Sequence, residues 1–188
     1  MTIVPKPTCE TIMASVADSD DSAYLLSCDN KLLEVNAGFR RFALENGGVD
    51  VVERWRCESV LRAIAGPLRA YFDAAFRRAR ETGKPWEHAY ECSSPERLRR
   101  FHMTVYPVGV RLVTVHGLRV ESLTTWPTCA ADDGRYVHGG FIRMCSNCRR
   151  VQNPSGHKRW DWVPAYLQHA PAAVSHGLCE ACARFYWP

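Results

Sequence analysis

Residues 23–48 read AYLLSCDNKLLEVNAGFRRFALENGG, and their pattern predicts the first elements of the fold. Apolar runs on either side of Asp29 and Asn30 indicate two short strands, because these two side chains tolerate tight-turn backbone angles. Asn36 is a good helix cap, and apolar residues at helical spacing follow it until Gly47 and Gly48 end the helix. The stretch therefore predicts a hairpin followed directly by a helix.

Downstream of this stretch the pattern changes from helical to alternating. A longer helix is predicted over about 66–82, with apolar side chains on one side and arginines on the other. From Trp86 onward apolar and polar residues alternate, which is typical of half-buried strands, and Pro107 and Gly109 are expected to break the run. Three antiparallel strands are expected over 86–92, 98–106 and 111–120. Two strands, then helices, then three strands predict an α+β fold with a five-stranded antiparallel sheet, not a repeating βαβ unit.

This order of elements resembles a PAS sensor domain. Residues 23–48 match the hairpin of such domains and the asparagine that opens their first helix, and YECSSPERLRRFHMTVYPV at 90–108 is similar to two of their central strands. RCESVL at 56–61 sits where PAS domains usually carry a Gly-x-Ser-Leu-like step, and the glycine is missing. The resemblance implies a sensor domain over 22–122, after a leader at 1–21 that can form a short helix.

A PAS domain implies either a pocket between sheet and helices, for haem, flavin or a small metabolite, or a packed core without a ligand. In the alternating pattern Trp86, His88 and Tyr90 share one face, and His102 lies on the neighbouring strand. These four residues are the candidate pocket residues. Burial in a core or at a dimer contact is the competing interpretation, and we expect a homodimer.

Four of the nine cysteines form two C-x-x-C pairs, CSNC at 145–148 and CEAC at 179–182. Zinc takes four ligands in a tetrahedron, and each pair places two thiolates on one tight turn. An odd number of cysteines and the lack of a secretion signal argue against a complete disulfide framework. The pairs therefore predict a zinc site, with iron and thiol–disulfide chemistry left open as alternatives. Its predicted ligands are Cys145, Cys148, Cys179 and Cys182.

A linker at 123–140 is expected to lead into a small treble-clef-like zinc module at 141–188. Its predicted parts are a hairpin at 149–163, a short helix at 164–169 and a final helix from 178, whose first turn holds the second cysteine pair. CSNCRRVQ, WDWVPAYLQH and SHGLCEACARFYW resemble a cysteine-rich tail attached to bacterial PAS-containing kinases and response regulators. His176 is an alternative ligand or a hydrogen-bond donor to a sulfur, and a histidine that caps a turn is the plainer interpretation.

The formal net charge of +4 comes from 24 basic and 20 acidic residues, so nucleic-acid binding does not follow from the composition. Basic residues do gather near the cysteines, and His157 is expected to be exposed among them. They define a second hypothesis, a DNA- or RNA-binding module, while oxidation of the zinc thiolates defines a third, a redox switch. The basic residues are Arg143, Arg149, Arg150, Lys158 and Arg159.

The sequence contains no phosphate-binding loop, haem-attachment motif or nucleophile elbow, so we expect no enzymatic activity. No run approaches the roughly 20 apolar residues of a membrane span, and the N-terminus has no apolar core behind a basic start. We therefore expect a cytoplasmic protein that does not enter a membrane. The leading hypothesis is a sensor or adaptor whose zinc module relays a signal to a protein partner that carries the output.

Overall fold

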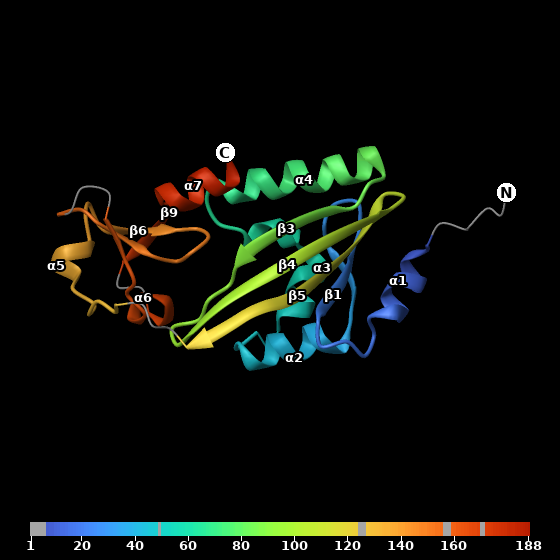
Figure 1. Cartoon of the computed structure of the whole chain (residues 1–188), viewed down its shortest axis with the longest axis horizontal. Coiled ribbons are helices and arrows are strands. Elements are labelled where there is room, and N and C mark those ends of the chain that lie inside the picture. Colours follow the sequence, from blue (N-terminus) through green and yellow to red (C-terminus); the bar gives the residue numbers. More distant parts are fainter. Residues whose placement is uncertain (1–6, 49, 124–126, 156–158, 170–171) are drawn as a thin grey trace. The chain divides into compact units, whose positions relative to one another are not determined.

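The computed structural model describes residues 7–48, 50–123, 127–155, 159–169 and 172–188 (Figure 1). The first elements in chain order are α1 (Cys9–Ser15), β1 (Ser22–Leu26), β2 (Leu32–Val35), α2 (Ala37–Glu45), α3 (Val51–Cys57), the 3-10 helix η1 (Val60–Ala63), α4 (Leu68–Thr82), β3 (Trp86–Glu91), β4 (Arg97–Val108) and β5 (Arg111–Leu123). The later elements are α5 (Asp133–Tyr136), β6 (Phe141–Cys145), β7 (Val151–Asn153), β8 (Arg159–Asp161), α6 (Ala165–Gln168), β9 (Ala173–Gly177) and α7 (Glu180–Tyr186). Within these ranges, no helix combines the length and the apolar character needed to cross a membrane.

The strands β1 to β5 form a five-stranded antiparallel sheet in the order β2-β1-β5-β4-β3. In this sheet β1 pairs with β2 on one side and with the central strand β5 on the other, where Ser22 lies opposite His116 and Leu26 opposite Leu112. The predicted α+β class with this sheet is confirmed. The strand β4 runs through Pro107 instead of ending before it, and β5 extends to Leu123, beyond the expected residue 120. A proline is tolerated near a strand end, where a missing N–H costs little.

Asn36 is buried and organises the start of the sheet. Its Oδ1 accepts hydrogen bonds from the backbone N–H groups of Ala23 and Phe39, both at 2.9 Å. Its Nδ2 donates to the carbonyl oxygens of Val16 at 2.7 Å and Asp21 at 2.9 Å. The predicted cap of α2 is therefore confirmed, and the same amide also holds β1 and the chain before it. All four hydrogen-bonding positions of the side chain are filled, as a buried amide requires.

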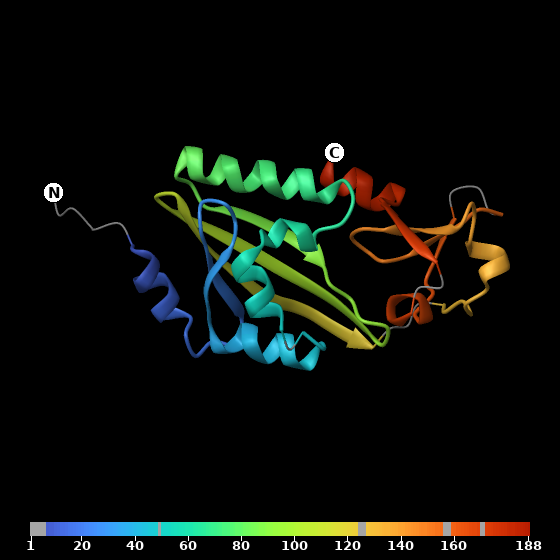
Figure 2. The same cartoon turned by 180° about the vertical axis from the view of Figure 1, so that it is seen from behind.

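Helices cover both faces of this sheet. Successive residues of a strand face opposite sides, so Leu25 and Tyr24 mark the two faces of β1. Leu25 and Val113 contact Met13 of α1, whereas the Tyr24 ring contacts Phe39 of α2 with centroids 5.6 Å apart. The helices α1 and α2 therefore lie on opposite faces, and Figure 2 shows α2 and α3 in front of the sheet.

Contacts divide the chain into two compact units. The first contains Met1–Ala63, Ala70–Ala89 and His102–Leu118, and the second contains Ile64–Arg69, Tyr90–Phe101 and Arg119–Pro188. The second unit thus includes the ends of β3, β4 and β5 as well as both cysteine pairs. The boundaries expected from the sequence, 22–122 for the sensor domain and 141–188 for the zinc module, stay a prediction.

The second unit contains a four-stranded sheet in the order β8-β7-β6-β9. The predicted hairpin is formed by β7 and β8, with Val151 opposite Asp161. The strand β9 was not predicted. It pairs in parallel with β6, from Phe141 opposite Ala173 to Cys145 opposite Gly177. The predicted short helix is α6, and the predicted final helix is α7.

One face of the smaller sheet carries the apolar core of the second unit. Tyr136 belongs to this core and is 1% exposed, although it lies among the residues expected to form a linker. A linker was expected because this segment has no periodicity, and a single-turn helix such as α5 is too short to show one. The buried core residues are Tyr136, Ile142, Met144, Val151, Val163 and Tyr166.

Asp161 is a buried carboxylate that holds the hairpin and α5 together. Its Oδ2 accepts hydrogen bonds from Tyr136 Oη at 2.8 Å and Asn153 Nδ2 at 2.9 Å, and its Oδ1 accepts one from Arg159 Nε at 2.7 Å. Three donors compensate the cost of burying the charge. Polar contacts thus contribute to the core of this unit alongside the apolar side chains.

Candidate metal centre

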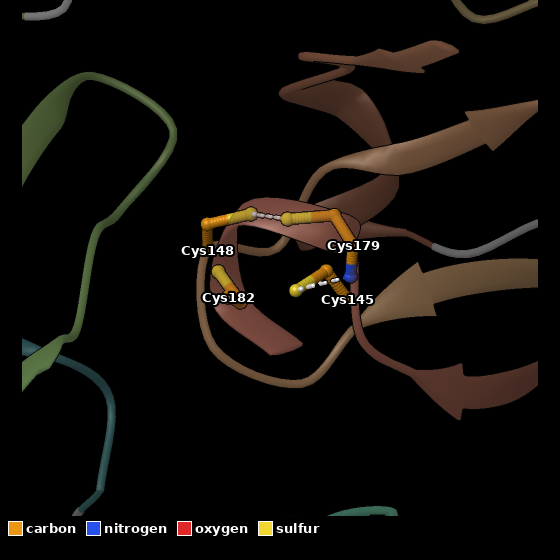
Figure 3. A group of neighbouring side chains, drawn as sticks. All are labelled: Cys145, Cys148, Cys179 and Cys182. Carbon is orange, nitrogen blue, oxygen red and sulfur yellow. Dashed lines mark hydrogen bonds between the residues drawn. The ribbon is translucent and has the colours of Figure 1, made fainter. Parts of the chain in front are cut away.

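The two cysteine pairs meet at one end of the smaller sheet. Cys145 is the last residue of β6, and Cys148 follows it across a tight turn. Cys179 caps the N-terminus of α7, and Cys182 lies in the first turn of that helix. The four Sγ atoms all lie within 4.8 Å of one another, and all four residues are buried (Figure 3). The nine cysteines are free thiols, so no disulfide joins these sulfurs.

The arrangement of the sulfurs fits a tetrahedral metal ion. Zinc–sulfur bonds of about 2.3 Å give sulfur–sulfur edges of about 3.8 Å in a regular tetrahedron. The Sγ atoms of Cys148 and Cys179 are 3.8 Å apart. The backbone N–H of Cys179 donates to Cys145 Sγ at 3.4 Å, and such hydrogen bonds stabilise thiolate ligands. The four cysteines therefore form a ligand set suited to zinc.

The four thiols are close enough to control one another's protonation. Hydrogen bonds from the neighbouring thiols, that of Cys148 first, lower the pKa of Cys145. The hydrogen bond with Cys145 is the main cause that raises the pKa of Cys148. The four thiols therefore differ in how readily they lose a proton. A divalent cation favours deprotonation of all its thiol ligands, so metal binding would release protons.

His176 lies in β9 and is not in the group of side chains close enough to share a metal, among the residues described. It sits opposite Met144 in the parallel pair, and neighbouring residues of a parallel pair face the same side. Its Nδ1 is buried without a hydrogen-bond partner in the described part of the chain. Burial, followed by the nearby Arg149, lowers the pKa of His176.

The basic residues of the second hypothesis are partly engaged within the second unit. Arg143 Nη1 donates to Gln152 Oε1 at 3.1 Å, and Arg159 is bound to Asp161. Arg149 has a φ of +62° in the turn after Cys148. Lys158 and His157 lie outside the described residues.

The candidate pocket residues fall into two groups. In the first unit Trp86 and His88 stack with ring centroids 5.3 Å apart, and Phe72 of α4 lies edge-on to Trp86 at 5.8 Å. Burial, and then His102, lower the pKa of His88 to about 4, so it is neutral at pH 7. His102 Nε2 also lies 3.4 Å from Glu87 Oε2.

Tyr90 belongs to the other group and stacks on Phe101 within the second unit, with centroids 5.5 Å apart. Trp86 and His88 thus share an aromatic environment with α4, and Tyr90 has its own partner on β4. The shared strand face was visible in the alternating pattern. The partners of each ring depend on how α4 and β4 pack against β3.

Asn147 is a site residue that no sequence pattern indicated. It is 6% exposed, and its Nδ2 donates to Cys182 Sγ at 3.3 Å. Its Oδ1 accepts from Tyr186 Oη at 3.0 Å and from the backbone N–H of Glu91 at 3.3 Å. Its position between two ligands was the available signal, but spacing does not predict where a side chain inside such a turn points.

No protein-family model matches the chain, and no curated protein matches it. A domain of an HTR-like protein from Haloarcula marismortui is similar in structure, with a TM-score of 0.42 and 16% identity, over 54% of this chain and 100% of that domain. A domain of a sensory box sensor histidine kinase/response regulator from Geobacter sulfurreducens has a TM-score of 0.43 and 8% identity, over 57% of this chain and 91% of that one. A PAS domain from a two-component sensor histidine kinase has a TM-score of 0.32 and 12% identity, over 60% and 95%. These structural neighbours are a domain of an HTR-like protein, a domain of a sensor histidine kinase/response regulator and a PAS domain, each with a TM-score below 0.5.

Proposed function

We propose that the protein is a non-enzymatic sensor or adaptor, in which a PAS-like domain perceives a signal and a zinc module helps to relay it to a protein partner. The observation that carries the proposal is one chain that combines a sheet in the order β2-β1-β5-β4-β3 with four buried sulfurs within 4.8 Å of one another. Four protein thiolates fill the coordination shell of zinc. Such closed sites are structural, whereas catalytic zinc keeps an open position for water or substrate.

The signal would act on the aromatic group around Trp86 and His88, either through a bound ligand or through a change in packing. His88 is neutral at pH 7, and a neutral imidazole can accept as well as donate a hydrogen bond. We also propose that the zinc module has a treble-clef-like fold and that the protein forms a homodimer. We place it in a reducing compartment such as the cytoplasm. Reduced thiols persist in that compartment and keep the zinc ligands available.

Elemental analysis and a visible absorption spectrum of the purified full chain test the proposal. The expected result is one zinc per chain in a colourless protein. Protein purified under reducing conditions without any metal would contradict the zinc module, and colour would indicate iron, flavin or haem instead. Light scattering at increasing protein concentration tests the homodimer.

The nucleic-acid hypothesis predicts a different result for the same preparation. Binding to duplex or single-stranded probes would weaken steeply as the salt concentration rises, because phosphate contacts release counterions. The proposal made here predicts no such binding.

A further inference from the structure

The strand β3 lies at the edge of its sheet, and the turn between Cys145 and Cys148 contacts the end of this strand. In the sheet order β3 is last, and its strand neighbour among the described residues is β4. The backbone N–H of Cys92, just after β3, donates to the Arg99 carbonyl oxygen at 3.1 Å. Successive N–H groups of a strand point to opposite sides, so that of Glu91 points away from β4. It donates to Asn147 Oδ1 at 3.3 Å, within the second unit.

The same amide is bound to the cysteine cluster. Asn147 Nδ2 donates to Cys182 Sγ at 3.3 Å, while Oδ1 also accepts from Tyr186 Oη at 3.0 Å. An amide oxygen has two lone pairs, and here both have donors. Because the amide group is planar and rigid, a shift of the sulfur displaces the acceptor that holds Glu91. Asn147 is therefore one rigid link between a predicted metal ligand and a strand edge.

The neighbouring Ser146 is also held closely within the second unit. A Cβ added at Gly66 would lie 2.6 Å from Ser146 Oγ and 2.8 Å from the His176 carbonyl oxygen. Gly66 lies two residues before α4 and has a φ of +61°, so glycine suits both the backbone angle and the close approach. Both residues between the cysteines of the first pair thus contact segments that lie far from them in the sequence.

We propose that Asn147 couples the metal occupancy of the cysteine cluster to the edge of β3, so that binding or loss of metal changes how firmly this strand end is held. The inference rests on the proposed function, because it takes the four cysteines as the zinc site. The strand β3 continues without interruption from Glu91 to His88 and Trp86. A change in how firmly Glu91 is held can therefore be transmitted along β3 to His88 and Trp86.

Amide hydrogen exchange of the full chain, followed residue by residue by NMR, tests the coupling. The chain is compared with zinc bound and after chelation, both under reducing conditions. The Glu91 amide is expected to exchange about tenfold more slowly with zinc, the effect of one hydrogen bond. The Cys92 amide, bound within the hairpin, is the internal control and should change much less. Equal changes at Glu91 and Cys92, or none at Glu91, would overturn the coupling.

Two variants separate the coupling from general stabilisation. Asn147→Asp keeps an acceptor for Glu91 but loses the donor to Cys182, whereas the control Tyr186→Phe keeps both of these contacts. We expect Asn147→Asp to lose the zinc dependence of Glu91 exchange and Tyr186→Phe to retain it, with one zinc per chain in each by elemental analysis. Equal zinc dependence in the two variants would overturn the proposal.

Failure of the coupling and failure of the proposed function give different results. Wild-type protein that binds one zinc without any change at Glu91 overturns the coupling and leaves the zinc module intact. Wild-type protein that binds no metal overturns both. The wild-type comparison decides the coupling even where a variant does not fold.

Discussion

The sheet of the first unit and the cysteine region of the second unit are stabilised in different ways. The paired strands β1 and β5 bury Leu25, Leu26, Leu112 and Val113, each at most 5% exposed. In the second unit β7 and β8 have three residues each, and their arrangement depends on the buried Asp161. Apolar burial is spread over many contacts, whereas ligands and buried charges act one at a time. Single substitutions should therefore have larger and more local effects in the cysteine region.

Loss of a zinc ligand should have the largest effect. In Cys179→Ser we expect amide protection to fall in β6 to β9 and α7 while β1 and β2 keep theirs, because metal binding and local folding are coupled. Amide exchange at Val151 and Leu25 follows the two regions separately. The exposed Cys57 provides a control as Cys57→Ser, which should bind zinc normally. Simultaneous loss of protection at both positions would show that the two regions fold as one cooperative unit.

The next largest effect is expected at Asp161. Asp161→Asn removes the charge that accepts three hydrogen bonds, and should lower the free energy of unfolding by about 2 to 3 kcal/mol. Urea unfolding of the zinc-loaded protein measures the change. Asp18→Asn, at an exposed position, is the matched control and should change stability by less than about 0.5 kcal/mol. Similar losses in both variants would argue against a special role for Asp161.

The same carboxylate predicts a pH dependence. Burial by itself would raise the pKa of Asp161, but hydrogen bonds from Arg159, Tyr136 and Asn153 outweigh it and hold the pKa below 3.8. A group whose pKa is lowered by folding stabilises fully above its unfolded pKa and loses this contribution as the pH falls through the folded pKa. The stability difference between wild type and Asp161→Asn should be constant from about pH 7 to 5 and shrink below about pH 4. Urea unfolding over this range measures it, and a difference unchanged at pH 3 would contradict the mechanism.

Removal of the polar side chain of Asn36, in the first unit, should lower the free energy of unfolding by a smaller amount. Asn36→Ala removes the cap of α2 and leaves the buried N–H of Ala23 and the part-buried carbonyl groups of Val16 and Asp21 without this partner. We expect a loss of about 2 kcal/mol in the free energy of unfolding, measured by thermal denaturation. Asn46→Ala, at an exposed position after the same helix, should cost less than about 1 kcal/mol. If both variants lose equally, the buried network of Asn36 contributes little.

The smallest effect is expected at Arg80, a residue of α4 that donates hydrogen bonds to the turn between β4 and β5 and to the turn between β1 and β2. Its Nε donates to the Val110 carbonyl oxygen at 2.9 Å, and its Nη2 donates to the Ser27 carbonyl oxygen and to Asn30 Oδ1 at 3.0 and 2.7 Å. A lysine lacks the planar fork that reaches these acceptors. Arg80→Lys should lower the free energy of unfolding by about 1 kcal/mol in urea titrations. The exposed Arg78→Lys should be neutral, and a loss of the same size there would contradict this explanation.

Local patterns predicted most elements because each depends on residues close together in the sequence. The hairpin around Asp29, the cap at Asn36 and the alternating strand from Trp86 all follow from turn chemistry, capping and periodicity. The metal ligands were predictable for the same reason, since the spacing inside each C-x-x-C pair is local. These features were determined by the sequence itself.

The tertiary structure alone decided which distant segments meet. The parallel pairing of β9 with β6, the burial of Tyr136 and the contact of Asn147 with Glu91 each join residues far apart in the chain. No local pattern specifies such pairs, because the direction of a side chain and the partner of a strand edge depend on how the whole unit packs. The cysteines could therefore be named from the sequence, whereas the residue that links them to the sheet required the fold.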